Sequence, residues 1–125
     1  GEREWNVAGY EAILATGTCD VFGIDPGRAE GVTGFTKVVS RIESAKRQAN
    51  AHAWSSAIVS AASIAVSFSS LAFKLFEFKP LPNPMQNDLV LTPLTHTDGW
   101  VYPPIDKPGL GIEINEDVVN KYRQK

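Results

Sequence analysis

The chain has 125 residues, of which 43% are hydrophobic, and this is enough for one modest domain with its own core. Its net charge of −2 argues against nucleic acid as the main partner, because there is no basic surplus to neutralise phosphates. The single cysteine, Cys19, excludes an intrachain disulfide and fits a reducing cytoplasm.

The ends and the longest uncharged stretch give no sign of a membrane protein. The charged start Gly1–Trp5 lacks the apolar segment of a signal peptide. Ala57–Phe73 carries no charge, but it is short for a membrane span and is full of serine and alanine. A buried helix followed by a buried strand explains it better, so we expect a soluble, cytoplasmic protein with no membrane partner.

The first part of the chain is predicted to alternate helices and strands. A helix is expected over Asn6–Thr16, with Asn6 as its N-cap and Gly17 as its end. A strand then ends at Asp25, and a loop rich in glycine and proline follows at Pro26–Gly31. Thr33 is expected to cap a second helix that runs to about Arg47, with apolar residues at helical spacing.

The next two strands differ in how clearly the sequence indicates them. Gln48–Ala51 is far too polar for a strand buried between two others, and only its position between two helices supports it. The helix Ser56–Ser67 is nearly apolar all round, which indicates burial on most sides. The strand Ala72–Phe76 follows, with Lys74 inside it, so we expect a poorly formed strand or a face that is not buried.

After Phe78 the alternation stops. Three prolines make Lys79–Pro84 irregular. A small hairpin is expected from Leu89–Leu94 and Trp100–Tyr102, around a turn at 97–99. Asn115 is expected to cap a last helix, whose charges match the helix dipole at both ends: Glu116, Asp117, Lys121 and Arg123.

Four polar residues recur at nearly constant intervals along this pattern. Glu2, Asp25, His52 and Glu77 are separated by 23, 27 and 25 residues, and the last three each follow a predicted strand. The interval is about one strand, one helix and two short loops. In a parallel α/β barrel, successive strand ends meet at the rim where the chemistry is done. The spacing therefore predicts an active site from these four residues.

Each of these residues also has a purely structural interpretation. His52 could be a satisfied histidine at a helix start, and Asp25 before Pro26 could be a turn residue. Glu77 in an apolar strand is harder to explain structurally, because a buried carboxylate is costly without a partner. Trp54 could shape a pocket or pack in the core, and Arg28 could meet an anionic substrate or lie in solvent. His96, in a polar turn, is expected to be a bystander.

Several separate blocks of the chain resemble one protein family. They are Glu2 after Gly1, DPGRAEGVTGFTKV at 25–38, HAWSSAI at 52–58, FEFKPLPNPMQNDL at 76–89 and DKPGLGIEINEDVV at 106–119. Together they resemble the C-terminal half of mandelate racemase/muconate lactonizing enzyme-like members of the enolase superfamily. The resemblance covers essentially the whole chain in the family's order.

The resemblance implies a role for each of the four residues. Family members bind Mg²⁺ through three acidic residues on successive strands and remove a proton α to a substrate carboxylate. By resemblance, Glu2 matches the third metal ligand, His52 the catalytic base, Asp25 the aspartate that orients it, and Glu77 the acidic residue that stabilises the enolate. Imidazole suits a general base near neutral pH, and a buried aspartate fixes its tautomer.

The resemblance also implies the architecture. A whole barrel needs roughly 250 residues, so we expect an α/β fold that is a partial TIM-type barrel of the last three to four β/α units. Residues 1–79 would be barrel and 80–125 an extension that packs toward the family's capping domain. The first two metal ligands lie on earlier strands in the family, so this chain is expected to be a fragment, inactive alone, of an acid-sugar dehydratase or racemase.

Two interpretations of the chain as a whole remain. The first is this enzyme fragment, with a carboxylate-bearing substrate in the parent. The alternative is a non-catalytic structural half barrel that self-associates. A half barrel exposes strand edges and an inner face around Val21, Phe73 and Phe76, so the partner is expected to be a second copy or a complementing N-terminal half.

Overall fold

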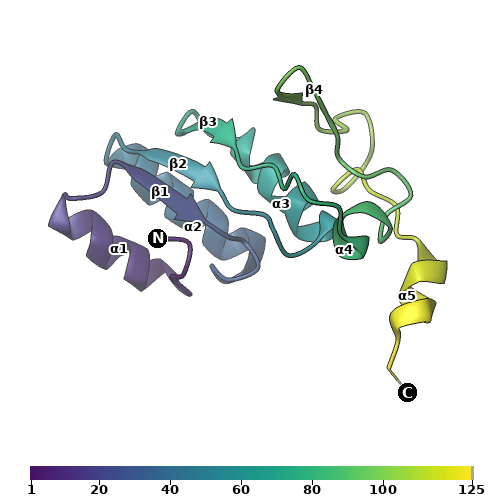
Figure 1. Cartoon of the computed structure of the whole chain (residues 1–125). Coiled ribbons are helices and arrows are strands. Elements are labelled where there is room, and N and C mark those ends of the chain that lie inside the picture. The colour runs from purple at the N-terminus through teal and green to yellow at the C-terminus, as the bar shows by residue number, and fades with distance from the viewer. Residues whose placement is uncertain (125) are drawn as a thin grey trace.

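The computed structural model describes residues 1–124 and alternates helices and strands over the first two-thirds of the chain (Figure 1). The alternating elements are α1 (Val7–Thr16), β1 (Val21–Ile24), α2 (Gly31–Ser44), β2 (Gln48–Ala51), α3 (Ala57–Ser67) and β3 (Phe73–Phe76). Four short elements follow, which are α4 (Pro84–Asn87), β4 (His96–Thr97), β5 (Trp100–Val101) and α5 (Glu116–Tyr122). The predicted α/β class is confirmed.

The main sheet has three parallel strands in the order β1-β2-β3. Its helices lie against one side of it (Figure 1). Because the strands are parallel, their carboxyl ends lie at one edge of the sheet, which is the geometry that the spacing of the polar residues predicts. Within residues 1–124 the sheet stays open.

The core lies between the sheet and the helices. Phe22 and Ile24 of β1 are fully buried against Phe35, Val38 and Ile42 of α2. Burying such apolar side chains stabilises a fold by about 1.5–3 kcal/mol each.

The polar segment Gln48–Ala51 forms a strand because only one of its faces enters the core. Ala49 and Ala51 are buried toward the helices, whereas Gln48 is exposed and Asn50 is half-buried. The strand is polar overall, and two alanines are sufficient for its covered face.

The helix ends follow the predicted caps in α1 and α3 and depart from them in α2. The Asn6 side chain accepts from the Gly9 amide, and Ser56 caps α3 in the same way. The predicted start of α2 at Thr33 is wrong, since the helix begins at Gly31 after Glu30, which has a left-handed backbone. It also ends at Ser44 rather than near Arg47, because the chain turns left-handed at Lys46.

The exposed inner face predicted around Val21, Phe73 and Phe76 is present in part, although the Phe73 and Phe76 side chains do not themselves lie open. Both side chains are half-buried and pack against the core, while Leu75 between them is 78% exposed. The register against β2 shifts between Ala49 and Asn50, and this irregularity changes which residues of β3 face the helices. Val21, at 52% exposed, does lie open as predicted.

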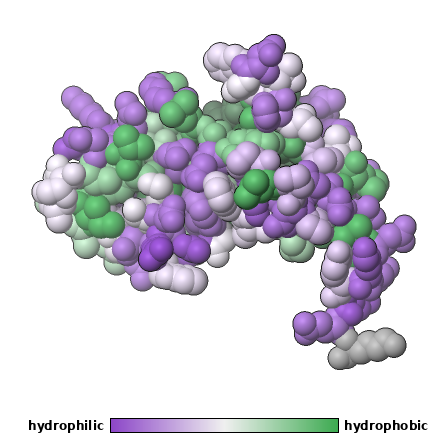
Figure 2. Space-filling view, in the orientation of Figure 1, coloured by the Kyte–Doolittle hydropathy of each residue, from purple (hydrophilic) through white to green (hydrophobic). Residues whose placement is uncertain are grey.

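The C-terminal part is mostly irregular. The hairpin is shorter than predicted, because it pairs only His96–Thr97 with Trp100–Val101. Leu89–Leu94 forms no strand and contributes one bridge, from Val90 to Ile114. α5 begins after Asn115 as predicted, although the Asn115 side chain makes no capping bond. It extends away from the sheet with a largely hydrophilic surface (Figures 1 and 2).

No helix within residues 1–124 is long and apolar enough to cross a membrane.

Candidate active site

The candidate site lies at the carboxyl edge of the three-stranded sheet. Asp25 directly follows β1, His52 directly follows β2 and Glu77 directly follows β3. The main-chain amide of His52 donates to the carbonyl of Ile24 at 2.8 Å, which extends the β1–β2 ladder up to the site.

Asp25 and His52 form a hydrogen-bonded pair. Oδ2 of Asp25 lies 2.9 Å from Nδ1 of His52, and Oδ1 accepts from the Gly27 amide at 2.7 Å. Asp25 is only 3% exposed. A buried carboxylate at this distance accepts a hydrogen bond from Nδ1–H, which favours the tautomer that presents its lone pair at Nε2. The predicted proximity of the two residues is confirmed.

Glu2 lies on the Nε2 side of the imidazole, and Glu77 lies close to both residues. Oε2 of Glu2 is 3.8 Å from Nε2 of His52. One ligand atom from each of Glu2, His52 and Glu77 lies within 4.8 Å of the others. The structure thus brings together all four residues that the spacing singled out, while their chemical roles stay predictions.

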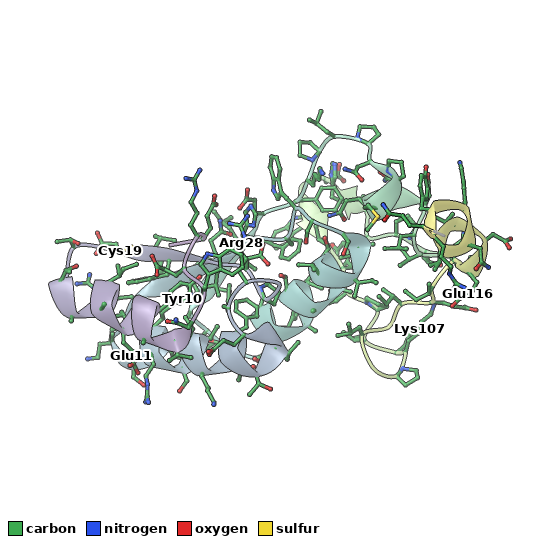
Figure 3. The ribbon with its side chains drawn as sticks, turned by 90° about the horizontal axis from the view of Figure 1, so that it is seen from below. Tyr10, Glu11, Cys19, Arg28, Lys107 and Glu116 are labelled. Carbon is green, nitrogen blue, oxygen red and sulfur yellow. The ribbon has the colours of Figure 1, made fainter. Side chains whose placement is uncertain are left out.

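Arg28 fixes the segment that carries Glu2. Its Nη1 donates to the main-chain carbonyl of Glu2 at 3.2 Å, and its guanidinium lies 5.9 Å from the centre of the Trp5 ring. Figure 3 shows Arg28 near Tyr10 at the centre of the molecule. The sequence left Arg28 either to meet an anionic substrate or to lie in solvent. In the structure its guanidinium binds the N-terminal segment instead.

Trp54 and Lys79 form one wall beside His52. The Trp54 ring lies nearly parallel to the imidazole, with centroids 6.3 Å apart and an interplanar angle of 10°. Lys79 Nζ lies 6.0 Å from the Trp54 ring centre and donates to the Trp54 carbonyl at 3.2 Å. At 38% exposed, Trp54 is not a core residue, which favours the pocket interpretation over core packing.

Three polar side chains that the sequence did not single out hold the backbone after β2. Ser63 donates to the His52 carbonyl at 3.3 Å, and the Ala53 carbonyl lies 2.9 Å from the Ser60 hydroxyl and 3.0 Å from Nε2 of Gln86. Ser60 and Ser63 are buried on α3, and Gln86 belongs to α4. The available signal was the set of serines on a helix whose other residues are apolar: Ser60, Ser63 and Ser67.

Tyr10 of α1 contacts the backbone of β1 close to the site. Its hydroxyl donates to the Gly23 carbonyl at 3.2 Å, and its ring is fully buried. Burial, aided by the negative charges of Glu4 and Asp25, raises the pKa of Tyr10 to about 12.

The other histidine and the cysteine lie outside the site. His96 is exposed on β4, where its ring meets the edge of Phe78 at 5.2 Å. Cys19 precedes β1, at the opposite end of the strand from Asp25 (Figure 3).

A profile of the family described as enolase C-terminal domain-like matches residues 1–118. A comparison with curated proteins gave no match.

Solved structures with the same fold come from the mandelate racemase/muconate lactonizing enzymes. A candidate mandelate racemase from Bordetella bronchiseptica, complexed with 2-oxoglutarate/phosphate, is 28% identical with a TM-score of 0.92, over 100% of this chain and 34% of that one. A candidate mandelate racemase/muconate lactonizing enzyme from Labrenzia alexandrii is 26% identical with a TM-score of 0.86, over 97% and 31%. A mandelate racemase/muconate lactonizing enzyme from Jannaschia sp. is 25% identical with a TM-score of 0.87, over 100% and 31%.

The chain spans about a third of the length of these relatives. Likeness to enzymes does not favour the alternative of a self-associating structural module. The predicted resemblance is confirmed, and the chain belongs to the enolase C-terminal domain-like family, in the part that it shares with mandelate racemase/muconate lactonizing enzymes.

Proposed function

We propose that this chain is the C-terminal part of an enzyme that removes a proton α to a substrate carboxylate, as an acid-sugar dehydratase or racemase. The observation that carries the proposal is the Asp25–His52 pair, whose Nε2 faces Glu2 and which lies close to Glu77 at the carboxyl ends of the strands. The four residues come from four separate segments, so their meeting is not a local accident of the chain.

In this proposal His52 is the general base. Asp25 keeps the proton on Nδ1, which leaves the Nε2 lone pair to take the proton from the substrate carbon. After the transfer, the Asp25 carboxylate stabilises the imidazolium. A positioned base of this kind contributes about 10²–10⁴-fold to rate.

Glu77 has the position to act on the developing negative charge. As a carboxylic acid, it can donate a hydrogen bond to the substrate carboxylate when the α-carbon loses its proton. Donors aimed at developing charge are typically the strongest contributors to such reactions. The parallel Trp54 ring and Lys79 would bound the substrate on the side of His52.

Glu2 fits one ligand position of a magnesium ion. Its carboxylate is the ligand type that Mg²⁺ prefers, it lies at the site edge, and the described residues supply too few oxygens for octahedral ligation. We propose that Glu2 holds the ion together with ligands on a further part of a longer protein. When bound, the ion would neutralise part of the negative charge that builds on the substrate.

The same proposal accounts for the unpaired side of β3 and for the uncovered face of the sheet. β3 pairs only with β2 within residues 1–124, and beside it a groove of about 510 Å³ runs between α3, β3 and the hairpin. Parallel sheets are normally covered on both faces. We propose that residues 1–79 are the last β/α units of a TIM-type barrel, that 80–125 form the extension, and that a complementing N-terminal segment covers this face.

The test uses the 125-residue chain and the longer protein side by side. The chain alone is expected to bind Mg²⁺ with a Kd no better than about millimolar, a weak interaction of roughly −4 kcal/mol, and to convert no aldonic or aldaric acid. The longer protein is expected to convert at least one of them, and His52→Asn to abolish that conversion. Micromolar Mg²⁺ binding by the chain alone, or conversion that His52→Asn leaves intact, contradicts the proposal.

A further inference from the structure

We infer that Glu2, His52 and Glu77 form a binding site for a borderline transition-metal ion such as Zn²⁺, a site that shares Glu2 with the proposed magnesium site. The three side chains present one carboxylate oxygen, one imidazole nitrogen and one further carboxylate oxygen within 4.8 Å of one another. They reach this point from the N-terminal segment and from the ends of β2 and β3.

The three side chains bring their lone pairs together with no hydrogen-bond donor between them. Asp25 holds the ring proton on Nδ1, so Nε2 presents a lone pair toward Glu2 Oε2 at 3.8 Å. Arg28 does not relieve this, because it donates to the main-chain carbonyl of Glu2 rather than to its side chain. Within residues 1–124 no hydrogen bond reaches the carboxylate of Glu77. A cation can accept an electron pair from all three side chains at once.

The donor set selects zinc over magnesium. Mg²⁺ demands oxygen ligands in near-octahedral geometry, whereas imidazole suits Zn²⁺ and its neighbours in the first transition row. Three protein ligands with one open position is the usual pattern of a zinc site that also holds water. Zinc–ligand bonds of about 2.0–2.2 Å require the side chains to close in by roughly 1 Å. The Glu2 side chain is half-exposed.

Asp25 orients the imidazole ligand of this site. A histidine that binds zinc almost always donates its other ring N–H to a carboxylate or carbonyl, which fixes the tautomer. Asp25 Oδ2 at 2.9 Å from His52 Nδ1 provides this contact, and Asp25 is itself fixed by the Gly27 amide. The complete arrangement is a carboxylate–histidine–metal triad with two further carboxylate ligands.

Zinc and the proposed base use the same nitrogen. A zinc ion on Nε2 of His52 removes the lone pair that would take a proton, so binding at this site would block proton abstraction. The site itself needs no substrate and no magnesium. Its failure and the failure of the proposed enzymatic function are therefore distinguishable, since zinc is measured by binding and the function by turnover.

The experiment titrates the 125-residue chain with Zn²⁺ by calorimetry, and with Co²⁺ by visible absorption, which reports coordination geometry. One zinc per chain is expected, bound at least tenfold more tightly than Mg²⁺. His52→Ala and Glu77→Gln are each expected to abolish the binding and the cobalt bands. Asp25→Asn, which keeps all three ligands, is expected to weaken binding by about 10–100-fold.

Matched controls exclude other ligands in the chain. His96→Ala removes the exposed histidine of β4, and Cys19→Ser removes the thiol at the far end of β1; both are expected to bind zinc as the parent chain does. Circular dichroism confirms that each variant is folded, and Glu77→Gln serves if His52→Ala is not. Zinc binding that survives both His52→Ala and Glu77→Gln, or that is no tighter than magnesium binding, overturns the inference.

Discussion

Lys46 occupies the position just after α2 that is usually glycine at a helix end. Replacing it with glycine should stabilise the protein. Its backbone has φ +56°, and its amide donates to Glu43 O at 2.9 Å while the Arg47 amide donates to Ile42 O at 3.0 Å. These two bonds define a Schellman motif. A side chain in this conformation costs about 1–2 kcal/mol, and glycine gives back roughly 0.5–1 kcal/mol through the entropy of the unfolded chain. Lys46→Gly is therefore expected to raise the free energy of unfolding by about 0.5–1 kcal/mol.

The matched control is the same change made inside α2. Lys37 is exposed in the middle of that helix, where glycine costs about 0.7–1 kcal/mol. Urea unfolding followed by circular dichroism should give shifts of opposite sign for Lys46→Gly and Lys37→Gly. If Lys46→Gly destabilises the protein as much as Lys37→Gly does, the left-handed end of α2 is not present in solution.

Three further predictions concern the groups around the site. The raised pKa of Tyr10 keeps its hydroxyl protonated in the folded protein, whereas the same group ionises near pH 10 in the unfolded chain. The free energy of unfolding should therefore fall by about 1 kcal/mol between pH 9 and pH 11. Urea unfolding at the two pH values should show that Tyr10→Phe removes this part of the fall. Gln86→Ala should lower the free energy of unfolding by about 1 kcal/mol, because it removes the hydrogen bond to the Ala53 carbonyl. The control Gln124→Ala, at an exposed position near the end of the chain, should change the free energy of unfolding little. Equal effects of the two substitutions would refute the contact. Nitrogen NMR of the imidazoles should find His52 with its proton on Nδ1, and Asp25→Asn should mix the tautomers while His96 is unaffected; an unchanged His52 spectrum would contradict the orienting role.

The meeting of Asp25 and His52 could be predicted from the sequence because it depends on topology alone. Parallel strands joined by helices place their carboxyl ends at one edge, so a regular interval between polar residues is enough to bring their side chains together. Glu77, directly after β3, follows the same rule, whereas Glu2 follows no strand within the described residues and reaches the site from the N-terminal segment. The chemical roles do not follow from it, since the interval fixes position and not protonation state or ligand.

Other features depended on contacts that the sequence does not encode locally. The polarity of Gln48–Ala51 counted against a strand, but strand formation required only that Ala49 and Ala51 face the helices. The exposure of the individual β3 side chains could not be derived from the sequence, because the register of β3 against β2 shifts between Ala49 and Asn50. The contacts of Ser60 and Gln86 with Ala53 join residues far apart in the chain, so no local pattern announced them.

The measurement that tests the central claim most directly is exchange of the substrate α-proton with solvent deuterium by the longer protein that carries this segment. With an aldonic or aldaric acid that it converts, proton NMR in D₂O should show loss of the α-proton signal. His52→Asn should slow that loss by at least about 10²-fold, the contribution of a positioned base, whereas His96→Asn should leave the rate unchanged. Exchange at the parent rate in His52→Asn would show that the residue at the end of β2 is not the base, and the proposed role of the site would be wrong.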